Sequence, residues 1–393
     1  MKIKTMTAVF SLLGMISSIS ALDMYTAEKS ILRLPVRVER DGRFVSGLNC
    51  GYFSVFSGES KLEVINCREF SRDAAGPGRE LLVFFALTDY NSLLEGALQE
   101  LVTNGMQETD QLTLITPRDT YTFNAEALKK RPITSVIEEL RNTVRRDIIN
   151  SGRQYKTLLN ELKRLSRSLR AQSGVGQGQT TRELYDEFDD SQFGMESAIQ
   201  RYQDTLTRIE NMRLLDNRRL ANLIRYAGRR GVPASLYLFH EKEYKPEIEA
   251  KTLTQMMILF TDRPHISHNL AMLFGLQQPQ DSFDNRALLH LLADNRAVFN
   301  VISVRSREQE GGLDMSESHG HLHEVFSALT VNSGGIYQVS GNPLSGMQEV
   351  VKTEANGYLL EIAGPEDLEF LQVEVRLSAE DLKLSYPRLI KKH

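Results

Sequence analysis

The apolar run Leu81-Leu82-Val83-Phe84-Phe85-Ala86-Leu87 is the stretch of sequence that decides the fold. An unbroken run of this length is typical of a strand that is buried on both faces of a parallel sheet. Strands that alternate with helices predict a doubly wound α/β sheet. Further apolar runs lie at residues 112–115, 236–239, 298–304, 336–339 and 358–362, with helical periodicity at 251–261, 286–295, 321–331 and 343–353.

The first 21 residues have the layout of a secretory signal peptide. Lys2 and Lys4 precede an apolar run from Met6 to Ile19, and Ser20-Ala21 offers a small-residue cleavage site. The run is short for a bilayer span, although an uncleaved N-terminal anchor is the alternative. No later stretch approaches about 18 uninterrupted apolar residues. We therefore expect a periplasmic or secreted protein with no integral membrane segment after cleavage of the signal peptide.

Composition limits the classes of partner. The 393 residues carry a formal net charge of −4, whereas general nucleic-acid-binding proteins are usually basic. We therefore expect no nucleic-acid partner. The chain is long enough for two or three structural units.

Residues 30–72 alternate apolar and polar side chains, with turn signals between the runs. This pattern predicts a small β unit ahead of the α/β domain. Its last two strands, at 52–56 and 61–67, are separated by Ser57-Gly58-Glu59-Ser60. Gly58 suits the first central position of a type II′ hairpin turn.

The chain has only two cysteines, Cys50 and Cys67. An exported protein meets an oxidising compartment, in which disulfides persist. If the hairpin register that pairs Ser57 with Ser60 continues outward, Cys50 faces Cys67 within reach of a cross-strand bond. We predict a Cys50–Cys67 disulfide, and two buried free thiols are the alternative.

A range without strand signals, from about 133 to 229, interrupts the alternation of strands and helices. Apolar residues at helical spacing lie on both sides of residues 173–179, which have the composition of a flexible linker. The pattern predicts a long helical hairpin of coiled-coil type. The first arm is basic and the next segment is acidic, so the two either pair, stay solvated or recognise a partner. The charged residues are Arg145, Arg146, Lys163, Arg164, Arg167 and Arg170, followed by Glu183, Asp186, Glu187, Asp189 and Asp190.

Several short motifs occur in a characteristic order. The β unit contains Leu34-Pro35-Val36-Arg37-Val38 and then Asp41-Gly42-Arg43-Phe44-Val45-Ser46-Gly47-Leu48. Ser333-Gly334-Gly335-Ile336-Tyr337 and Gly357-Tyr358-Leu359-Leu360 follow near the C-terminus. In this order and spacing, the chain resembles the von Willebrand factor type A (VWFA)-related proteins of bacteria. The resemblance implies a VWFA-like α/β domain over residues 79–386, interrupted by the helical insertion.

The resemblance also implies where a metal-ion-dependent adhesion site would lie. Such a site needs Asp-x-Ser-x-Ser after the first strand and an Asp after the fourth, because hard oxygen ligands hold Mg²⁺. Here Ala86, Thr88 and Tyr90 occupy the first motif, and His240 occupies the position of the later Asp. The site is therefore expected to be degenerate. Asp89 and Glu241 are alternative ligands.

No catalytic motif accompanies these features. His319, His321 and His323 alternate within 318–324, but on a helix His321 points away from the other two. We therefore expect neither an enzyme nor a cofactor. The sequence favours an exported scaffold that binds another protein without a functional metal site. The alternative is a metal-dependent adhesion module with an altered Mg-type site.

Overall fold

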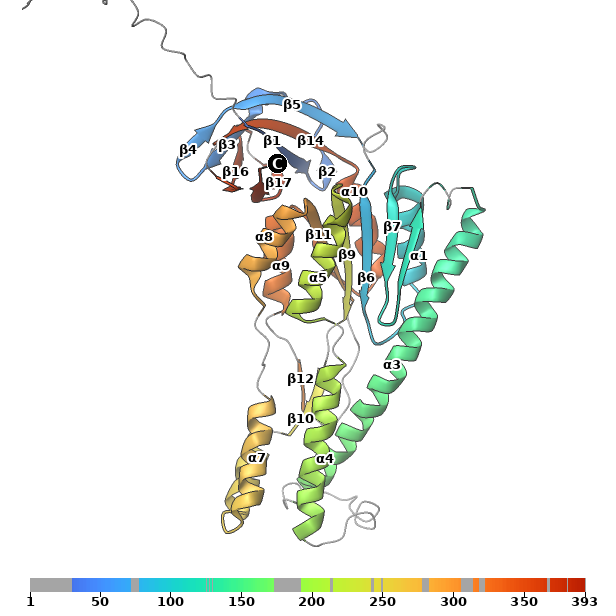
Figure 1. The fold of residues 1–393 in the computed structure, drawn as a ribbon, viewed down its shortest axis with the longest axis vertical. Coiled ribbons are helices and arrows are strands. Elements are labelled where there is room, and N and C mark those ends of the chain that lie inside the picture. The colour runs from blue at the N-terminus through green and yellow to red at the C-terminus, as the bar shows by residue number, and fades with distance from the viewer. Residues whose placement is uncertain are drawn as a thin grey trace, which may run out of the picture.

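The computed structural model arranges the chain in three parts: a β-sandwich, an α/β domain and a helical arm (Figure 1). The residues that it describes are 30–71, 78–124, 126, 128, 130–172, 192–212, 215–241, 244–248, 250–277, 283–304, 314–317, 322–365, 368–379 and 381–392. The predicted signal peptide at 1–21 lies outside the described residues. In the described part, no helix is both long enough and apolar enough to cross a membrane.

A six-stranded mixed sheet forms the centre of the α/β domain, with the order β13-β11-β9-β6-β7-β8. All neighbouring pairs are parallel except β7 and β8, which are antiparallel. The predicted α/β fold class is confirmed at this level. The strands are β6 (Glu80–Ala86), β7 (Gln111–Ile115), β8 (Thr120–Asn124), β9 (Ala234–Glu241), β11 (Ala297–Val304) and β13 (Tyr337–Ser340).

Helices cover both faces of this sheet because its strands bury side chains on both sides. Along β6, Leu81, Val83 and Phe85 belong to one core, whereas Leu82 and Ala86 belong to the other. The first face is covered by α1 (Leu94–Glu100), the beginning of α3 (Ile133–Gln172) and α10 (Pro343–Glu354). The second is covered by α5 (Asn217–Ala227), α8 (Asn285–Asp294) and α9 (Leu322–Ser333). The winding reverses between β6 and β9, which is the switch point of a doubly wound sheet.

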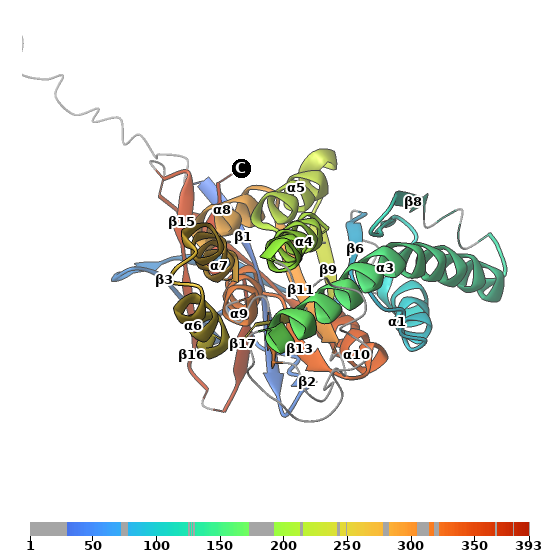
Figure 2. The same cartoon turned by 90° about the horizontal axis from the view of Figure 1, so that it is seen from below.

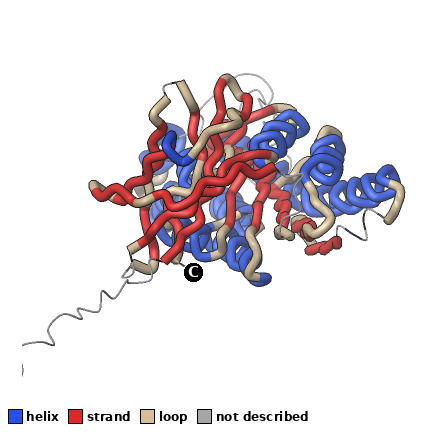
Figure 3. Tube along the Cα trace, turned by 90° about the horizontal axis from the view of Figure 1, so that it is seen from above, coloured by secondary structure: helices blue, strands red, loops and turns tan. Residues whose placement is uncertain are grey.

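The β-sandwich combines the predicted N-terminal β unit with the end of the chain. A five-stranded sheet, β17-β1-β14-β5 with β2 beside β1, shares one apolar core with strands of two smaller sheets. Seen from above, strands cover this end of the molecule (Figure 3). The N-terminal strands are β1 (Ser30–Arg40), β2 (Arg43–Phe44), β3 (Phe53–Ser57), β4 (Ser60–Leu62) and β5 (Val64–Ser71). The C-terminal strands are β14 (Asn356–Gly364), β15 (Phe370–Gln372), β16 (Glu374–Leu377), β17 (Lys383–Ser385) and β18 (Leu389–Lys391).

One predicted strand of the α/β sheet therefore lies elsewhere. The apolar run 358–362 is part of β14, which pairs antiparallel with both β1 and β5. A central strand of a sandwich sheet is as apolar on its inner face as a strand of a parallel sheet. Hydrophobicity alone could not separate the two settings.

The loop after α9 joins the sandwich to the α/β domain. The carbonyl oxygen of Gly334 accepts hydrogen bonds from the Arg37 side chain at 2.7 Å and from the Ser385 hydroxyl at 3.0 Å. Gly334 has a φ of +77°, and a Cβ there would lie 2.8 Å from the carbonyl carbon of Tyr386. Both the backbone angle and the lack of space require glycine. This explains physically why a glycine stands in the 333–337 motif.

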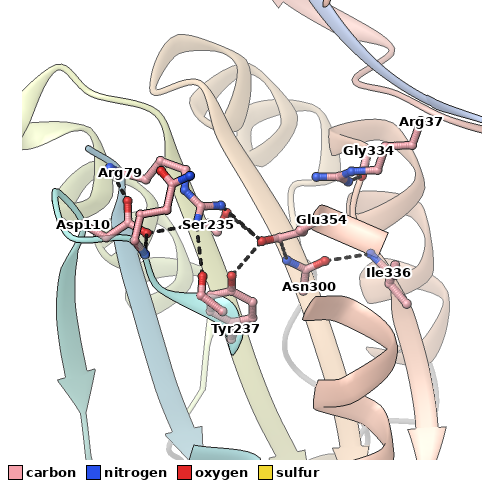
Figure 4. Close-up of polar contacts among 11 residues, drawn as sticks. Arg37, Arg79, Asp110, Ser235, Tyr237, Asn300, Gly334, Ile336 and Glu354 are labelled. Carbon is pink, nitrogen blue, oxygen red and sulfur yellow. Dashed lines mark hydrogen bonds and ion pairs between the residues drawn. The ribbon is translucent and has the colours of Figure 1, made fainter. Parts of the chain in front are cut away.

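A buried polar network lies beside this joint, at the amino ends of the strands (Figure 4). The carboxylate of Glu354, which is 4% exposed, accepts hydrogen bonds from Tyr237 and Asn300, both at 2.8 Å. Arg79 lies 3.6 Å from Glu354 and 3.0 Å from Asp110. Burial opposes the charge of Arg79, but the neighbouring Tyr237, Glu354 and Asp110 together raise its pKa above the ordinary value. The network ties α10 to four segments that the sequence separates widely.

The helical arm extends from the opposite end of the sheet, beyond the carboxyl ends of β6 and β9 (Figures 1 and 2). It contains the later part of α3, α4 (Gln192–Asn211), α6 (Ala250–Leu259) and α7 (Pro264–Gln277), which share one apolar core. β10 (Tyr244–Glu247) and β12 (Asp314–Glu317) form a ribbon that contacts α3.

The arm differs in extent from the predicted insertion at about 133–229. Val136, Leu140 and Val144 of α3 belong to the core of the α/β domain, whereas Leu158 and Leu165 belong to the arm. α6, which corresponds to the helix predicted at 251–261 for the α/β domain, also packs in the arm, together with α7. The helix α3 therefore runs without interruption from one core into the other, and the arm is a multi-helix cluster with its own core.

The two cysteines approach each other but are not bonded in this structure. They are free thiols, and the two residues lie 4.3 Å apart. The hairpin register is as predicted, with Ser57 opposite Ser60. However, Cys67 lies on β5 opposite Leu360 of β14, and Cys50 begins the short 3-10 helix η1 (Cys50–Tyr52). Burial and then the neighbouring Cys50 raise the pKa of the Cys67 thiol to about 12. The disulfide stays a prediction for an oxidising compartment.

Removal of the Glu354 carboxylate tests the importance of the buried network. Glu354→Ala removes the acceptor of the hydrogen bonds from Tyr237 and Asn300, and it leaves Arg79 with one fewer counter-charge. We expect a loss of about 3–5 kcal/mol in the free energy of unfolding, as measured by urea denaturation. The control is Glu374→Ala, which removes an exposed partner of Arg376. Equal stability of the two variants would contradict this role for the network.

Candidate functional site

The candidate site lies at the switch point, where the chain leaves the carboxyl ends of β6 and β9. In a doubly wound sheet, ligands bind in the crevice outside these strand ends. β6 is followed by the loop that contains Thr88 and Asp89, and β9 ends at Glu241. The predicted site residues belong to these two segments.

Glu241 bridges the two segments. One oxygen of its carboxylate, Oε2, accepts three hydrogen bonds: from the Thr88 amide at 3.1 Å, the Thr88 hydroxyl at 3.1 Å and the Asp89 amide at 3.3 Å. Burial raises the pKa of Glu241, and although the hydrogen bonds from Thr88 lower it, the charge of Asp89 adds to the rise. The carboxylate thus serves as an internal anchor for the loop after β6.

The helix α3 covers this loop directly. Gly152 is buried, and a Cβ at this position would overlap the carbonyl oxygen of Thr88. One turn further along, the ammonium of Lys156 forms an ion pair with the carboxylate of Asp89. Seen from below, α3 passes beneath the sheet at this point (Figure 2). The carboxyl edge is therefore occupied by the protein's own helix.

A second set of contacts fixes α3 to the loops before and beside this crossing. Arg141 lies 3.2 Å from Glu95 of α1, and the guanidinium of Arg145 lies 5.9 Å from the ring centre of Tyr90. Burial, followed by the charge of Glu95, raises the pKa of Tyr90, although Arg141 and Arg145 act in the opposite direction. These contacts connect α3 to the loop and helix that follow β6.

Asp147 attaches α3 to the end of β7. Its side chain is 2% exposed and accepts hydrogen bonds from the Thr116 hydroxyl at 2.9 Å and the Tyr121 hydroxyl at 2.8 Å. Burial alone would raise the pKa of Asp147, but hydrogen bonds from Tyr121, Thr116 and Arg146 outweigh it and hold the pKa below its usual value. Asp147 therefore holds α3 against β7 and β8, and both of its carboxylate oxygens accept hydrogen bonds from neighbouring side chains.

The structure brings together some of the predicted site residues and separates others. Thr88, Asp89 and Glu241 converge, which is the alternative ligand set. Ala86 and His240 pair across the sheet and face the second core, where the His240 ring lies edge-on to Phe326 at 5.1 Å. Tyr90 packs partly buried against the first core.

Gly152, Lys156 and Asp147 were not identified from the sequence. Each depends on contacts between segments that are distant in the chain. A glycine inside a long helical pattern was the one available signal, because such a glycine usually has a packing reason.

The described residues hold no group of three or more His, Cys, Asp or Glu that could bind a metal ion. Of the three alternating histidines at 318–324, His319 and His321 lie outside the described residues. His323 lies on α9, and its Nδ1 is 2.8 Å from the Tyr337 hydroxyl. On α7, the Nε2 of His265 lies 2.6 Å from the Glu196 carboxylate. His323 and His265 thus each have a polar neighbour within the fold.

Comparisons with known proteins give little further guidance. No protein-family model matches the chain, and no curated protein matches it. Among solved structures, the chain is similar to the human COPII-coat protein Sec24c, with 9% sequence identity and a TM-score of 0.31. The match covers 83% of this chain and 46% of that one, so the chain spans less than half the length of this neighbour. A likeness this small supports no inference about function.

A larger side chain at Gly152 tests whether α3 is fixed against the β6 loop. Gly152→Leu should force α3 away from Thr88 and lower the free energy of unfolding by about 1–3 kcal/mol. The matched control is Asn160→Leu, an exposed position of the same helix. Leucine favours helix over glycine by roughly 0.8–1 kcal/mol, so any loss at Gly152 must come from the clash. Unchanged or increased thermal stability of Gly152→Leu would contradict the close approach.

Proposed function

We propose that the chain is an exported, non-enzymatic protein of the periplasm or cell exterior that binds another protein or assembles with it. Its α/β domain would be a VWFA-related scaffold without a working metal site, and its helical arm would engage the partner. The observation that carries the proposal is the closed carboxyl edge, where Glu241 holds the β6 loop and α3 lies over it.

Sheet topology and motif order support the VWFA-related assignment. The strand order, numbered from β6, is that of a doubly wound sheet with one switch point. A β unit precedes this sheet in sequence, in agreement with the order of features in the bacterial family. The glycine pair of the 333–337 motif stands where the chain must pass close to two other segments: Gly334 against Tyr386 and Gly335 against Phe299.

The chemistry of the switch point supports metal-independent binding. A Mg²⁺ ion needs several oxygen ligands in near-octahedral geometry. Here Glu241 already accepts three hydrogen bonds, and the ammonium of Lys156 lies against Asp89. A second cation at this position would be repelled by Lys156 and would have to displace the existing hydrogen bonds.

The shape of the molecule supports the arm as the contact surface. The arm projects away from the α/β domain and has its own apolar core (Figure 1). It is also fixed at its base through Gly152, Lys156 and Asp147. A projection that is both internally packed and anchored at its base presents side chains with little loss of conformational entropy on binding.

Site-specific crosslinking tests the proposal. A photoreactive amino acid replaces Asn160, which is exposed on the arm, and, in a matched protein, Lys61, which is exposed on the sandwich. We expect a discrete protein adduct at position 160 in the native exported fraction, formed equally in EDTA and in Mg²⁺. No adduct at 160, or equal adducts at both positions, would refute arm-mediated binding.

A metal-dependent adhesion module is the second candidate, and one observation favours it. Thr88, Asp89 and Glu241 do converge at the switch point, so the oxygen atoms of an altered site are near one another. Their use as ligands would require α3 to release Asp89 from Lys156.

Thermal melting distinguishes the two candidates. A ligand at 100 times its Kd stabilises a folded protein by about 2.7 kcal/mol, which moves the Tm by several degrees. We expect the Tm to be the same in Mg²⁺, in Mn²⁺ and in EDTA. A rise with metal that is abolished by Glu241→Ala would instead support the adhesion module.

A further inference from the structure

The exposed side of the later part of α3 carries a row of basic residues. Arg153, Lys156, Arg164 and Arg167 are exposed, and we call them the basic stripe. Their spacing of three, eight and three residues keeps them on one side of a helix. The opposite side is buried in the arm core through Tyr155, Leu158, Leu162, Leu165 and Leu169.

The surroundings of the stripe contain no exposed acid on the same helix segment. The other exposed residues between positions 153 and 167 are Gln154, Thr157 and Asn160, which are polar and neutral. The single carboxylate in this segment, Glu161, is half-buried. At 1.5 Å per residue the stripe is about 21 Å long. The whole chain has a net charge of −4, so this surface contrasts with the charge of the molecule.

Part of the stripe is available for intermolecular contact. In the described part of the chain, the side chains of Arg153 and Arg167 make no ion pair or hydrogen bond, whereas Lys156 pairs with Asp89. The neighbouring helix α4 does not neutralise these two arginines with its described acids. Its Glu196 lies against His265, and its Asp204 accepts a hydrogen bond from Gln200.

We propose that the basic stripe docks an acidic α-helix of the partner protein, an inference that rests on the proposed protein-binding function. Arginine presents a planar fork that matches a carboxylate with two parallel hydrogen bonds. Carboxylates three or four residues apart on a helix lie along a line, as the basic residues of the stripe do. A row of glutamates on a partner helix therefore matches the stripe in both charge and shape.

The composition of the stripe argues against a lipid surface. An anionic membrane attracts each nearby basic residue by about 1 kcal/mol, so four residues contribute roughly 4 kcal/mol. This corresponds to only millimolar affinity. Stable surface binding also needs apolar side chains that enter the bilayer interface, and the stripe has none between Arg153 and Arg167.

A charge-matched pair of variants tests the stripe. Arg153→Glu/Arg167→Glu reverses its two unpaired arginines. Arg201→Glu/Arg208→Glu makes the same change at two exposed positions of α4, on the same arm. The probe is a 21-residue alanine-based helical peptide with glutamates along one face, and its glutamine analogue is the neutral control. We expect the glutamate peptide to bind the wild-type chain and the α4 variant alike, and the stripe variant at least about tenfold more weakly.

Three results would overturn the inference. The first is an equal loss of peptide affinity in the α4 variant, because the loss would then come from the change in net charge and not from the position of the stripe. The second is no binding of the glutamate peptide to the wild-type chain at low salt. The third is stripe-dependent binding to phosphatidylglycerol vesicles in preference to the peptide. Unchanged Tm values of both variants confirm that each is folded.

The crosslinking experiment separates failure of the stripe from failure of the proposed function. The position-160 adduct should be lost when the photoreactive residue is combined with Arg153→Glu/Arg167→Glu. An adduct that persists in this background refutes the stripe while the protein-binding function stands. The absence of any adduct in the wild-type background refutes both.

Discussion

The contact between Gly152 of α3 and the carbonyl of Thr88 is the constraint on which the carboxyl end of the sheet and the helical arm depend. Only glycine lets the helix axis pass so close to the β6 loop. Once α3 is seated there, Lys156 reaches Asp89 and Asp147 reaches Thr116 and Tyr121. The same helix then continues into the arm, so one close approach sets both the closure of the carboxyl edge and the direction of the arm.

The other end of the sheet is organised by different chemistry. There the Glu354 network and the Gly334 loop join α10, the strands and the sandwich through buried hydrogen bonds. The buried Glu354 carboxylate accepts hydrogen bonds from Tyr237 and Asn300 and lies 3.6 Å from Arg79, which is what makes its burial tolerable. The central sheet is thus held at both ends. The Glu354 network lies at the amino ends of the strands, and α3 crosses the carboxyl end of β6.

Local sequence patterns predicted the elements better than their partners. Buried parallel strands are continuously apolar, and for this reason the runs at 81–87 and 112–115 identified β6 and β7. The run at 358–362 looks the same but belongs to the sandwich. Apolar content alone does not show to which sheet a strand belongs. The boundary between the α/β domain and the arm could not be predicted from the sequence either. The apolar positions of α3 continue from Val136 to Leu169 without a change of period. Of the candidate site, Thr88, Asp89 and Glu241 were identified through the resemblance to the VWFA-related proteins, which implies where a metal site would lie. Gly152 and Lys156 join the site only through tertiary contacts.

A closed switch point changes what this type of sheet can offer a partner. The crevice outside the strand ends normally supplies the site, because backbone and side-chain polar groups converge there. In this chain Thr88, Asp89 and Glu241 bind each other, and Asp89 also pairs with Lys156 of α3. The position of the crevice is therefore where the helical arm begins. On the proposed function, the arm provides the interaction surface, because one side of α3 is buried in the arm core and the other side is exposed. That outer side is basic along the later part of α3, in a chain that is acidic as a whole. On the proposed function, the partner therefore binds a convex surface formed by a helix and not a concave site formed by strand ends. The pattern of charges on that helix, and not a bound cation, would select the partner.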